Sequence, residues 1–143
     1  MKRILLSLII ILGCSIFADA QVLSYRAKSL TLTRFKNGNI DATWEDKNIN
    51  YLIVLDGNKR ITTIYEDKNT LIYDVVSASS KPNDAIGNSV VEQICLGRDG
   101  VVCVIMLTFP QIDSKRPHDL LKPYSLRIIY DDLVMHYEMY PLY

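Results

Sequence analysis

The sequence predicts an all-β protein, a single antiparallel meander of about eight or nine strands that forms a small barrel or a flattened sandwich. Short runs rich in Val, Ile, Thr and Tyr recur along the chain, and Gly, Asn and Asp bound them, as turns bound strands. Beyond the first twenty residues, no segment repeats apolar residues at helical spacing over three turns. Most connections between the runs are short, which favours antiparallel neighbours.

The expected strands follow one another from near residue 22 to the end of the chain. They cover Val22–Phe35, Asp41–Trp44, Asn50–Leu55, Arg60–Tyr65, Thr70–Val76, Ser89–Leu96, Val101–Phe109, Tyr124–Tyr130 and Leu133–Tyr140. The turns between them contain Asn37-Gly38, Asp56-Gly57-Asn58, Asp67-Lys68-Asn69 and Asp131-Asp132, and Asn69 suits a left-handed position. The connections over residues 77–88 and 110–123 are longer, and such loops are either functional or mobile.

Two strands carry further information. With Asp131-Asp132 as the loop of the last hairpin, Ile128 and Met135 face each other on a core side, whereas Arg127 and His136 share the opposite, mainly polar side. The segment Val101–Phe109 is apolar on both faces, so it must be covered on two sides. It is expected to be a central strand of the barrel or sandwich, with contact to a second protomer as the alternative.

The first twenty residues resemble a secretory signal peptide. Lys2 and Arg3 precede an apolar run of fourteen residues, Ile4–Phe17, and Ala18-Asp19-Ala20 forms a cleavage site before Gln21. A bilayer-spanning helix needs about 20 apolar residues, so a permanent transmembrane anchor is not expected. We therefore expect residues 1–20 to be a signal peptide, residues 21–143 to be one all-β domain, and the protein to be exported to the periplasm or the extracellular space.

A second route of export stays open, because Ile11-Leu12-Gly13-Cys14 resembles a bacterial lipobox in which Cys14 would be lipidated. The bulky Leu12 and the well-formed site at Ala20 favour cleavage after Ala20. The leader holds two of the sixteen basic and one of the sixteen acidic residues, which leaves a formal charge of −1 on the rest. That balance does not support nucleic-acid binding, and no polybasic run suggests an anionic membrane surface.

Two cysteines remain after the leader, too few for a four-thiolate zinc site. If Arg98 to Gly100 form a three-residue hairpin loop, with Gly100 in the left-handed position, Cys95 and Cys103 face each other across the strands. An oxidising compartment favours a disulfide between them, although directly opposed β-carbons lie about 4.5–5.5 Å apart and a disulfide prefers about 3.5–4.5 Å. Two buried free thiols are the alternative.

No catalytic signature is present, so we expect no enzyme activity, no metal and no cofactor. The motifs H-E-x-x-H and G-x-S-x-G are absent, and the only two histidines, His118 beside Asp119 and His136 opposite Arg127, are explained by a solvated loop and a surface polar cluster. The nine tyrosines suit half-buried strand positions, and some could line a binding site. The candidate ligand-binding residues are Tyr124, Tyr137, Tyr140 and Trp44.

Three stretches carry a resemblance to a known group of proteins. Trp44-Glu45-Asp46 with Asn50 to Val54, then Arg60 to Tyr65, and Tyr73 to Ser77 resemble segments of small exported proteins from Bacteroides-type gut bacteria. The layout is similar as well, with a signal peptide, a β-meander and a late hairpin that contains Cys and an Asp-Gly turn. The resemblance implies export and an all-β fold, and it implies no activity.

Together these features predict an exported, non-enzymatic binding module of unknown specificity that holds a small apolar or aromatic ligand. A lipocalin-like or calycin-like layout fits the strand count, although Gly38 and Trp44 are too far apart for the G-x-W motif of lipocalins. The alternative is an envelope protein that associates with itself or with another protein, through an edge strand or through Val101–Phe109.

Overall fold

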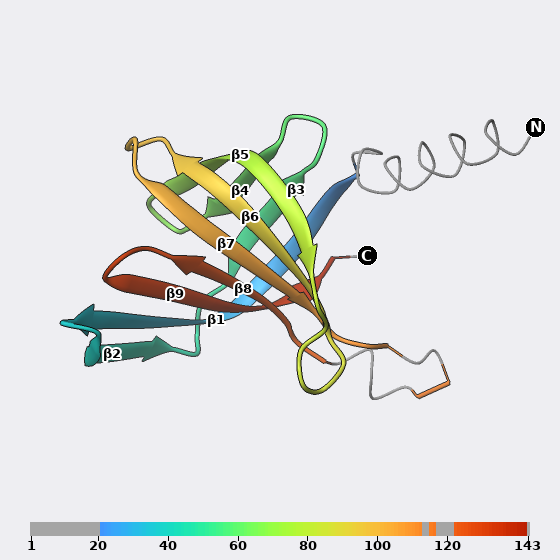
Figure 1. Cartoon of the computed structure of the whole chain (residues 1–143). Coiled ribbons are helices and arrows are strands. Elements are labelled where there is room, and N and C mark those ends of the chain that lie inside the picture. The colour runs from blue at the N-terminus through green and yellow to red at the C-terminus, as the bar shows by residue number, and fades with distance from the viewer. Residues whose placement is uncertain (1–20, 113–114, 117–121, 143) are drawn as a thin grey trace, which may run out of the picture.

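The chain folds into an antiparallel β-barrel, which the computed structural model describes for residues 21–112, 115–116 and 122–142 (Figure 1). The predicted leader, including Cys14, lies outside the described residues, as do His118 and Asp119. The nine strands are β1 (Val22–Lys36), β2 (Asn39–Asp46), β3 (Tyr51–Asp56), β4 (Ile61–Tyr65), β5 (Thr70–Lys81), β6 (Ser89–Gly97), β7 (Val102–Phe109), β8 (Tyr124–Ile129) and β9 (Leu133–Pro141). No described residue belongs to a helix long and apolar enough to span a membrane.

The predicted meander is confirmed, and it closes into a barrel rather than a flattened sandwich. Strands β3 to β9 pair in sequence order, and β9 returns to pair with β1, so eight strands form the closed wall. The ninth strand, β2, pairs with β1 alone. Closure through β1 and β9 removes the two open edges that a flat sheet of these strands would leave.

The length of β1 allows it to contact three partners. Its residues 25–34 pair with β9, its residues 22–27 pair with β3, and its residues 30–36 pair with β2. A strand has only two edges, so β3 and β2 must follow each other along the edge opposite β9. The hairpin of β1 and β2 consequently projects beyond the end of β3, and Figure 1 shows β2 beside the C-terminal half of β1.

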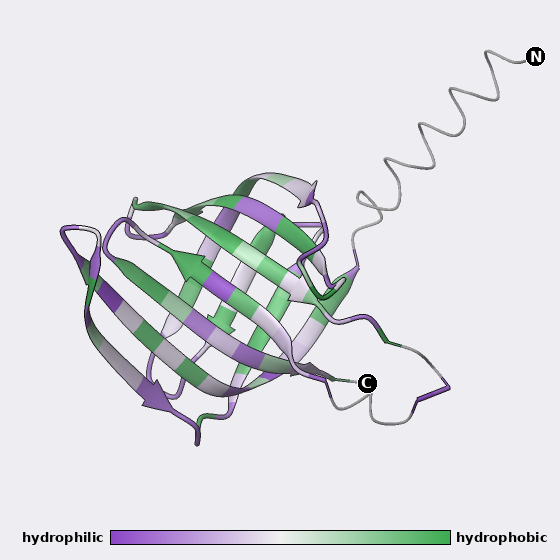
Figure 2. Ribbon diagram, turned by 60° about the horizontal axis from the view of Figure 1, so that its bottom comes forward, coloured by the Kyte–Doolittle hydropathy of each residue, from purple (hydrophilic) through white to green (hydrophobic). Residues whose placement is uncertain are grey.

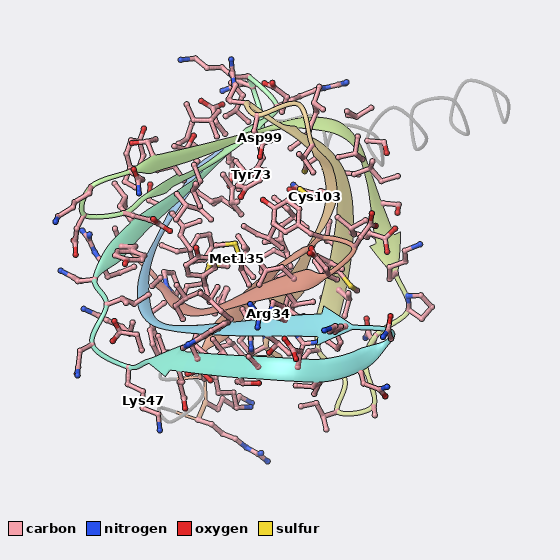
Figure 3. The ribbon with its side chains drawn as sticks, turned by 90° about the vertical axis from the view of Figure 1, so that its left-hand side faces the viewer. Arg34, Lys47, Tyr73, Asp99, Cys103 and Met135 are labelled. Carbon is pink, nitrogen blue, oxygen red and sulfur yellow. The ribbon has the colours of Figure 1, made fainter. Side chains whose placement is uncertain are left out.

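Alternating side chains give the wall an apolar inner face, and Figure 2 shows hydrophobic and hydrophilic residues alternating along the strands. Within β7, Cys103, Ile105 and Leu107 are buried, whereas Val102 is 64% exposed. Tyr73, Cys103 and Met135 lie inside the ring of strands in Figure 3, and Asp99 and Lys47 lie at its rim. The buried cluster among the described residues comprises Tyr25, Ala27, Ile49, Ile53, Leu55, Ile64, Tyr73, Cys95, Cys103, Ile105, Leu107, Leu126, Ile128, Tyr137 and Met139.

The predicted turn chemistry is also confirmed at two hairpins. Asn37 and Gly38 have φ angles of 53° and 78°, as the loop of a type I′ hairpin requires. Gly100 has a φ of 85° and its N–H donates to the Gly97 carbonyl, which closes the loop between β6 and β7. Glycine occupies this position because a β-carbon is strained at positive φ.

One predicted loop is wrong in part. Residues 77–81 continue β5 and pair with residues 90–94 of β6, so the loop between these strands is shorter than the sequence suggested. The pairing shifts register between Val75 and Ser77, which marks Val76 as a β-bulge residue. The bulge interrupts the alternation of side chains along β5, so the sequence pattern did not predict that the polar residues 77–81 belong to the strand.

Candidate functional site

The four predicted ligand-binding residues do not converge on one place. Tyr137 is fully buried, and its hydroxyl donates to Glu66 Oε1 at 3.3 Å. The Tyr124 ring lies 5.5 Å from the Tyr25 ring and 5.9 Å from the Phe109 ring. Tyr140 follows the buried Met139 and therefore faces outward.

Trp44, the fourth of these residues, belongs to the projecting hairpin. Its side chain is 51% exposed, and the Arg34 guanidinium lies over its ring at 5.5 Å from the centroid. Arg34 also forms an ion pair with Asp41 at 2.6 Å. A ligand role of Trp44 would thus be separate from any role of the three tyrosines, and all four roles stay predictions.

A groove on the outer wall of β7, β8 and β9 brings polar and apolar side chains together. Two rows of opposed residues form its floor. In the first row Met106 faces Arg127, which faces His136, and in the second Thr108 faces Ser125, which faces Glu138. Because neighbouring residues on a strand alternate between faces, these six side chains share the outer face.

The groove has a volume of about 400 Å³ and is bounded by the β5–β6 connection and by the start of β8. Asp84, Val90, Pro123 and Tyr124 complete its lining. Asp84 fixes the shape of the connection, since its carboxylate accepts from the backbone N–H groups of Ile86 and Asn88 at 3.1 and 2.9 Å. One wall of the groove is therefore held by a tight turn.

A serine–histidine pair lies on the groove floor, where Ser125 Oγ is 2.8 Å from His136 Nε2. Burial lowers the pKa of His136 below its ordinary 6.5, and the Arg127 charge lowers it further, against a smaller opposing effect of Glu138. His136 is consequently neutral near pH 7. This neutral imidazole can exchange a hydrogen bond with Ser125 and with a bound molecule.

Two charged groups of the groove have no partner among the residues that the structure describes. Among the described residues, the side chains of Arg127 and Glu138 form no hydrogen bond and no ion pair, although they lie in adjacent rows of one surface. The described residues likewise contain no group of three or more His, Cys, Asp or Glu side chains arranged to hold a metal ion. Within the described part of the chain, the groove therefore offers a cation and an anion that no side chain neutralises.

The sequence predicted part of this surface and missed the rest. Register within the last hairpin placed Arg127 opposite His136, and the structure confirms that pairing. The contribution of Met106 and Thr108 depends on the register between β7 and β8, which a long connection separates. A long loop does not fix the register of the strands that it joins, so no local signal pointed to the groove.

The predicted disulfide is absent: Cys95 and Cys103 are free, buried thiols, although they face each other as expected. The Gly97 N–H donates to the Val101 carbonyl, and pairs alternate along a ladder, so Cys95 and Cys103 form a hydrogen-bonded pair. The two Cα atoms of such a pair lie about 5.5 Å apart, with β-carbons farther apart than a disulfide prefers. The β-carbon spacing usual for such a pair is thus wider than a disulfide prefers, which agrees with the free thiols.

Comparison of the chain with protein-family models, with curated proteins and with solved structures found no match. The class of the protein therefore follows from its own geometry. It is an eight-stranded antiparallel β-barrel with one accessory strand and a polar groove on its outer wall.

Proposed function

We propose that this chain is an exported, non-enzymatic β-barrel binding protein that holds a small ligand in the outer groove. The observation that carries the proposal is a groove of about 400 Å³ in which a guanidinium and a carboxylate, neither paired with any described residue, lie with a Ser–His pair beside apolar side chains. Small-molecule sites are typically concave, about 300–1,000 Å³ in volume, and combine apolar lining with a few polar groups.

The outer groove is a better ligand site than the barrel interior. Inward-facing side chains such as Ile53, Ile105 and Leu126 are fully buried against one another. A ligand among them would have to displace packed apolar groups, whereas a ligand in the groove would displace water. We therefore propose the outer wall, and not the barrel interior, as the site of the small ligand.

The surroundings of Ser125 and His136 favour binding over catalysis. A serine nucleophile needs N–H donors aimed at the developing oxyanion. Here β8 lies between β7 and β9, and β9 lies between β8 and β1, so ladders on both sides engage the backbone amides near the pair. Because the ladders of the described strands leave no backbone N–H free at this place, the Ser–His pair lacks the backbone oxyanion hole that a serine nucleophile commonly uses.

A fluorescence titration with 1-anilinonaphthalene-8-sulfonate tests the groove, because this probe combines an aromatic body with an anionic group. We expect saturable binding of one probe per chain and a Kd about tenfold higher for Arg127→Met, which corresponds to about 1.4 kcal/mol. The control is Arg98→Met, which removes an exposed guanidinium at the β6–β7 turn. Absence of saturable binding, or equal binding by wild type and Arg127→Met, would overturn the proposal.

Export rests on the sequence of residues 1–20, namely the basic start, the apolar run and the Ala18-Asp19-Ala20 site. Mass spectrometry of the protein from the producing cell tests it. A chain that begins at Gln21 supports export by signal peptidase, and a lipid-modified Cys14 supports the lipoprotein alternative. An intact chain that begins at Met1 or Lys2 would overturn export.

A second candidate function, association with another protein, is favoured by the free edge of β2. Among the described strands, this strand of eight residues pairs only with β1; it contains no Pro or Lys and carries Ile40 at 66% exposure. Such an edge is a template for strand addition. Sedimentation tests this association: Thr43→Lys on the edge of β2 should weaken it, and Thr63→Lys on the doubly paired β4 is the control. A wild-type protein that sediments as a monomer and binds no partner through β2 would argue against it.

A further inference from the structure

An apolar surface adjoins the groove on the same outer wall. We call it the outer stripe and define it as Ile94, Leu96, Val102, Val104, Ile129 and Val134. Ladder pairs join Ile94 to Val104, Val104 to Ile129, and Ile129 to Val134, and Leu96 faces Val102 one row further on. The residues form a row of four across β6 to β9 and a neighbouring row of two on β6 and β7.

The outer stripe is accessible to solvent. Ile94 is 42% exposed, Leu96 is 37% exposed and Val102 is 64% exposed, while the other three members are half-buried. A contiguous exposed apolar surface beside polar groups is typical of a binding site. The sequence predicted that Val101–Phe109 needs cover on two faces. The core covers its inner face, whereas no described residue covers the outer face at Val102.

The chemistry of this wall changes in a fixed order along β8 and β9. Successive side chains on one face of a strand lie about 7 Å apart. Along β8 the outer face presents Ile129, then Arg127, then Ser125, and along β9 it presents Val134, then His136, then Glu138. Taken row by row, the wall is apolar at Ile129 and Val134, cationic at Arg127 and anionic at Glu138. The cationic and anionic rows lie within the groove.

We propose, on the basis of the binding function above, that the ligand is a single-chain zwitterionic amphiphile. Its hydrocarbon chain covers the outer stripe, its anionic group binds Arg127, and its terminal cationic group faces Glu138. In such a molecule the anionic group lies between the chain and the cationic group, which is the order that complements the wall. The Ser125–His136 pair lies beside the anionic group and offers it a further hydrogen bond.

Other occupants match the wall less well. A fatty acid would leave the Glu138 carboxylate without a counter-charge, and a cationic amphiphile would place its charge against Arg127. A second copy of the chain would present a broad sheet face, which cannot enter a groove bounded by the turn at Asp84. The zwitterionic amphiphile satisfies both free charges and covers the apolar surface at once.

The test compares three amphiphiles of equal chain length below their micelle concentrations, namely dodecylphosphocholine, dodecanoate and dodecyltrimethylammonium. Calorimetric titration and displacement of 1-anilinonaphthalene-8-sulfonate measure their binding. We expect dodecylphosphocholine to bind about tenfold more tightly than either of the other two. Glu138→Gln should abolish its advantage over dodecanoate. Equal affinities of the three amphiphiles for the wild-type protein would overturn the proposal.

Variants of the outer stripe test the hydrocarbon contact separately. Ile129→Ser and the more exposed Ile94→Ser should each weaken dodecylphosphocholine several-fold, with binding of the anilinonaphthalene probe retained. Val76→Ser is the control, because Val76 is 63% exposed and lies outside the stripe. The proposal would be overturned if both variants bound dodecylphosphocholine as tightly as the wild type. It would also be overturned if the wild type were a dimer that dissociates when Ile129 is replaced.

The two proposals fail in distinguishable ways. Failure of the anilinonaphthalene probe to bind contradicts the groove as a ligand site. Binding of that probe without displacement by dodecylphosphocholine contradicts only the assignment of the ligand class.

Discussion

The hydroxyl oxygens of Tyr73 and Tyr130 lie 2.8 Å apart inside the barrel. Tyr73 belongs to β5 and Tyr130 directly follows β8, two strands that share no ladder. The hydrogen bond therefore joins opposite parts of the wall across the interior, where Tyr73 is only 3% exposed. A hydrogen bond in this position satisfies two polar groups that the apolar core could not otherwise accommodate.

Removal of both hydroxyls should cost less than the sum of the two single removals. Tyr130→Phe leaves the buried Tyr73 hydroxyl without a partner, and we expect a loss of about 1–3 kcal/mol in the free energy of unfolding. Tyr73→Phe should cost less, because the half-buried Tyr130 can reach water. The double variant should lose less than the sum of the two. Urea unfolding of the wild type, the two single variants and the double variant gives a double-mutant cycle. Strict additivity of the losses would show that the two hydroxyls are not coupled.

Buried tyrosines should make the barrel unstable in alkali. Burial raises the pKa of Tyr73 well above its ordinary 10.0, and the hydrogen bond to Tyr130 adds to the effect. Burial raises the pKa of Tyr137 as well, with the charge of Glu66 as the next cause. Above pH 10 the unfolded chain loses these protons and the folded chain keeps them, so stability falls as pH rises.

Thermal unfolding between pH 8 and 11.5 measures this loss. Tyr137→Phe should flatten the decline above pH 10, because it removes one of the buried hydroxyls whose pKa is raised. A decline of equal steepness in wild type and Tyr137→Phe would contradict the assignment.

His136 should produce the opposite dependence in acid. Burial and the neighbouring Arg127 lower the pKa of His136, and only Glu138 opposes them. Below pH 6.5 the unfolded chain takes up a proton that the folded chain resists, so stability is present at neutral pH and is lost as pH falls. His136→Gln should reduce this loss between pH 7 and 5. Chemical unfolding at both values checks it, and an unchanged difference would assign the loss to other groups.

The outcome at particular residues shows what the sequence could and could not predict. The register of the last hairpin followed from alternation on both strands, because a two-residue loop leaves no freedom to slip. The left-handed residue of the β3–β4 turn was not predicted: it is Arg60, which has a φ of 52°. At the β4–β5 turn the sequence favoured a left-handed Asn69, but Asn69 has no positive φ. The turn at Asn69 is instead closed by the Glu66 N–H, which donates to the Asn69 carbonyl at 2.9 Å.

Long-range pairings account for what the sequence did not indicate. The contact between β3 and the first half of β1, and the closure of β9 on β1, depend on residues more than twenty positions apart. Periodicity predicts that a segment is a strand and which face is apolar, but not which distant strand it meets. The groove depends on such a pairing, between β7 and β8, and therefore only the structure could reveal it.

The sequence predicted a disulfide between Cys95 and Cys103, whereas the structure contains two free thiols, and their reactivity distinguishes the two states. Burial raises the pKa of Cys95 to about 12 and that of Cys103 to about 11, so neither forms the reactive thiolate at neutral pH. We expect neither thiol of the folded protein to react with iodoacetamide at pH 8, and both to react in guanidinium chloride without prior reduction. Mass spectrometry counts the adducts, each of which adds one carbamidomethyl group. A chain that gains two adducts only after reduction would instead contain the disulfide, and the β-carbons of Cys95 and Cys103 would then lie closer together than is usual for a hydrogen-bonded pair.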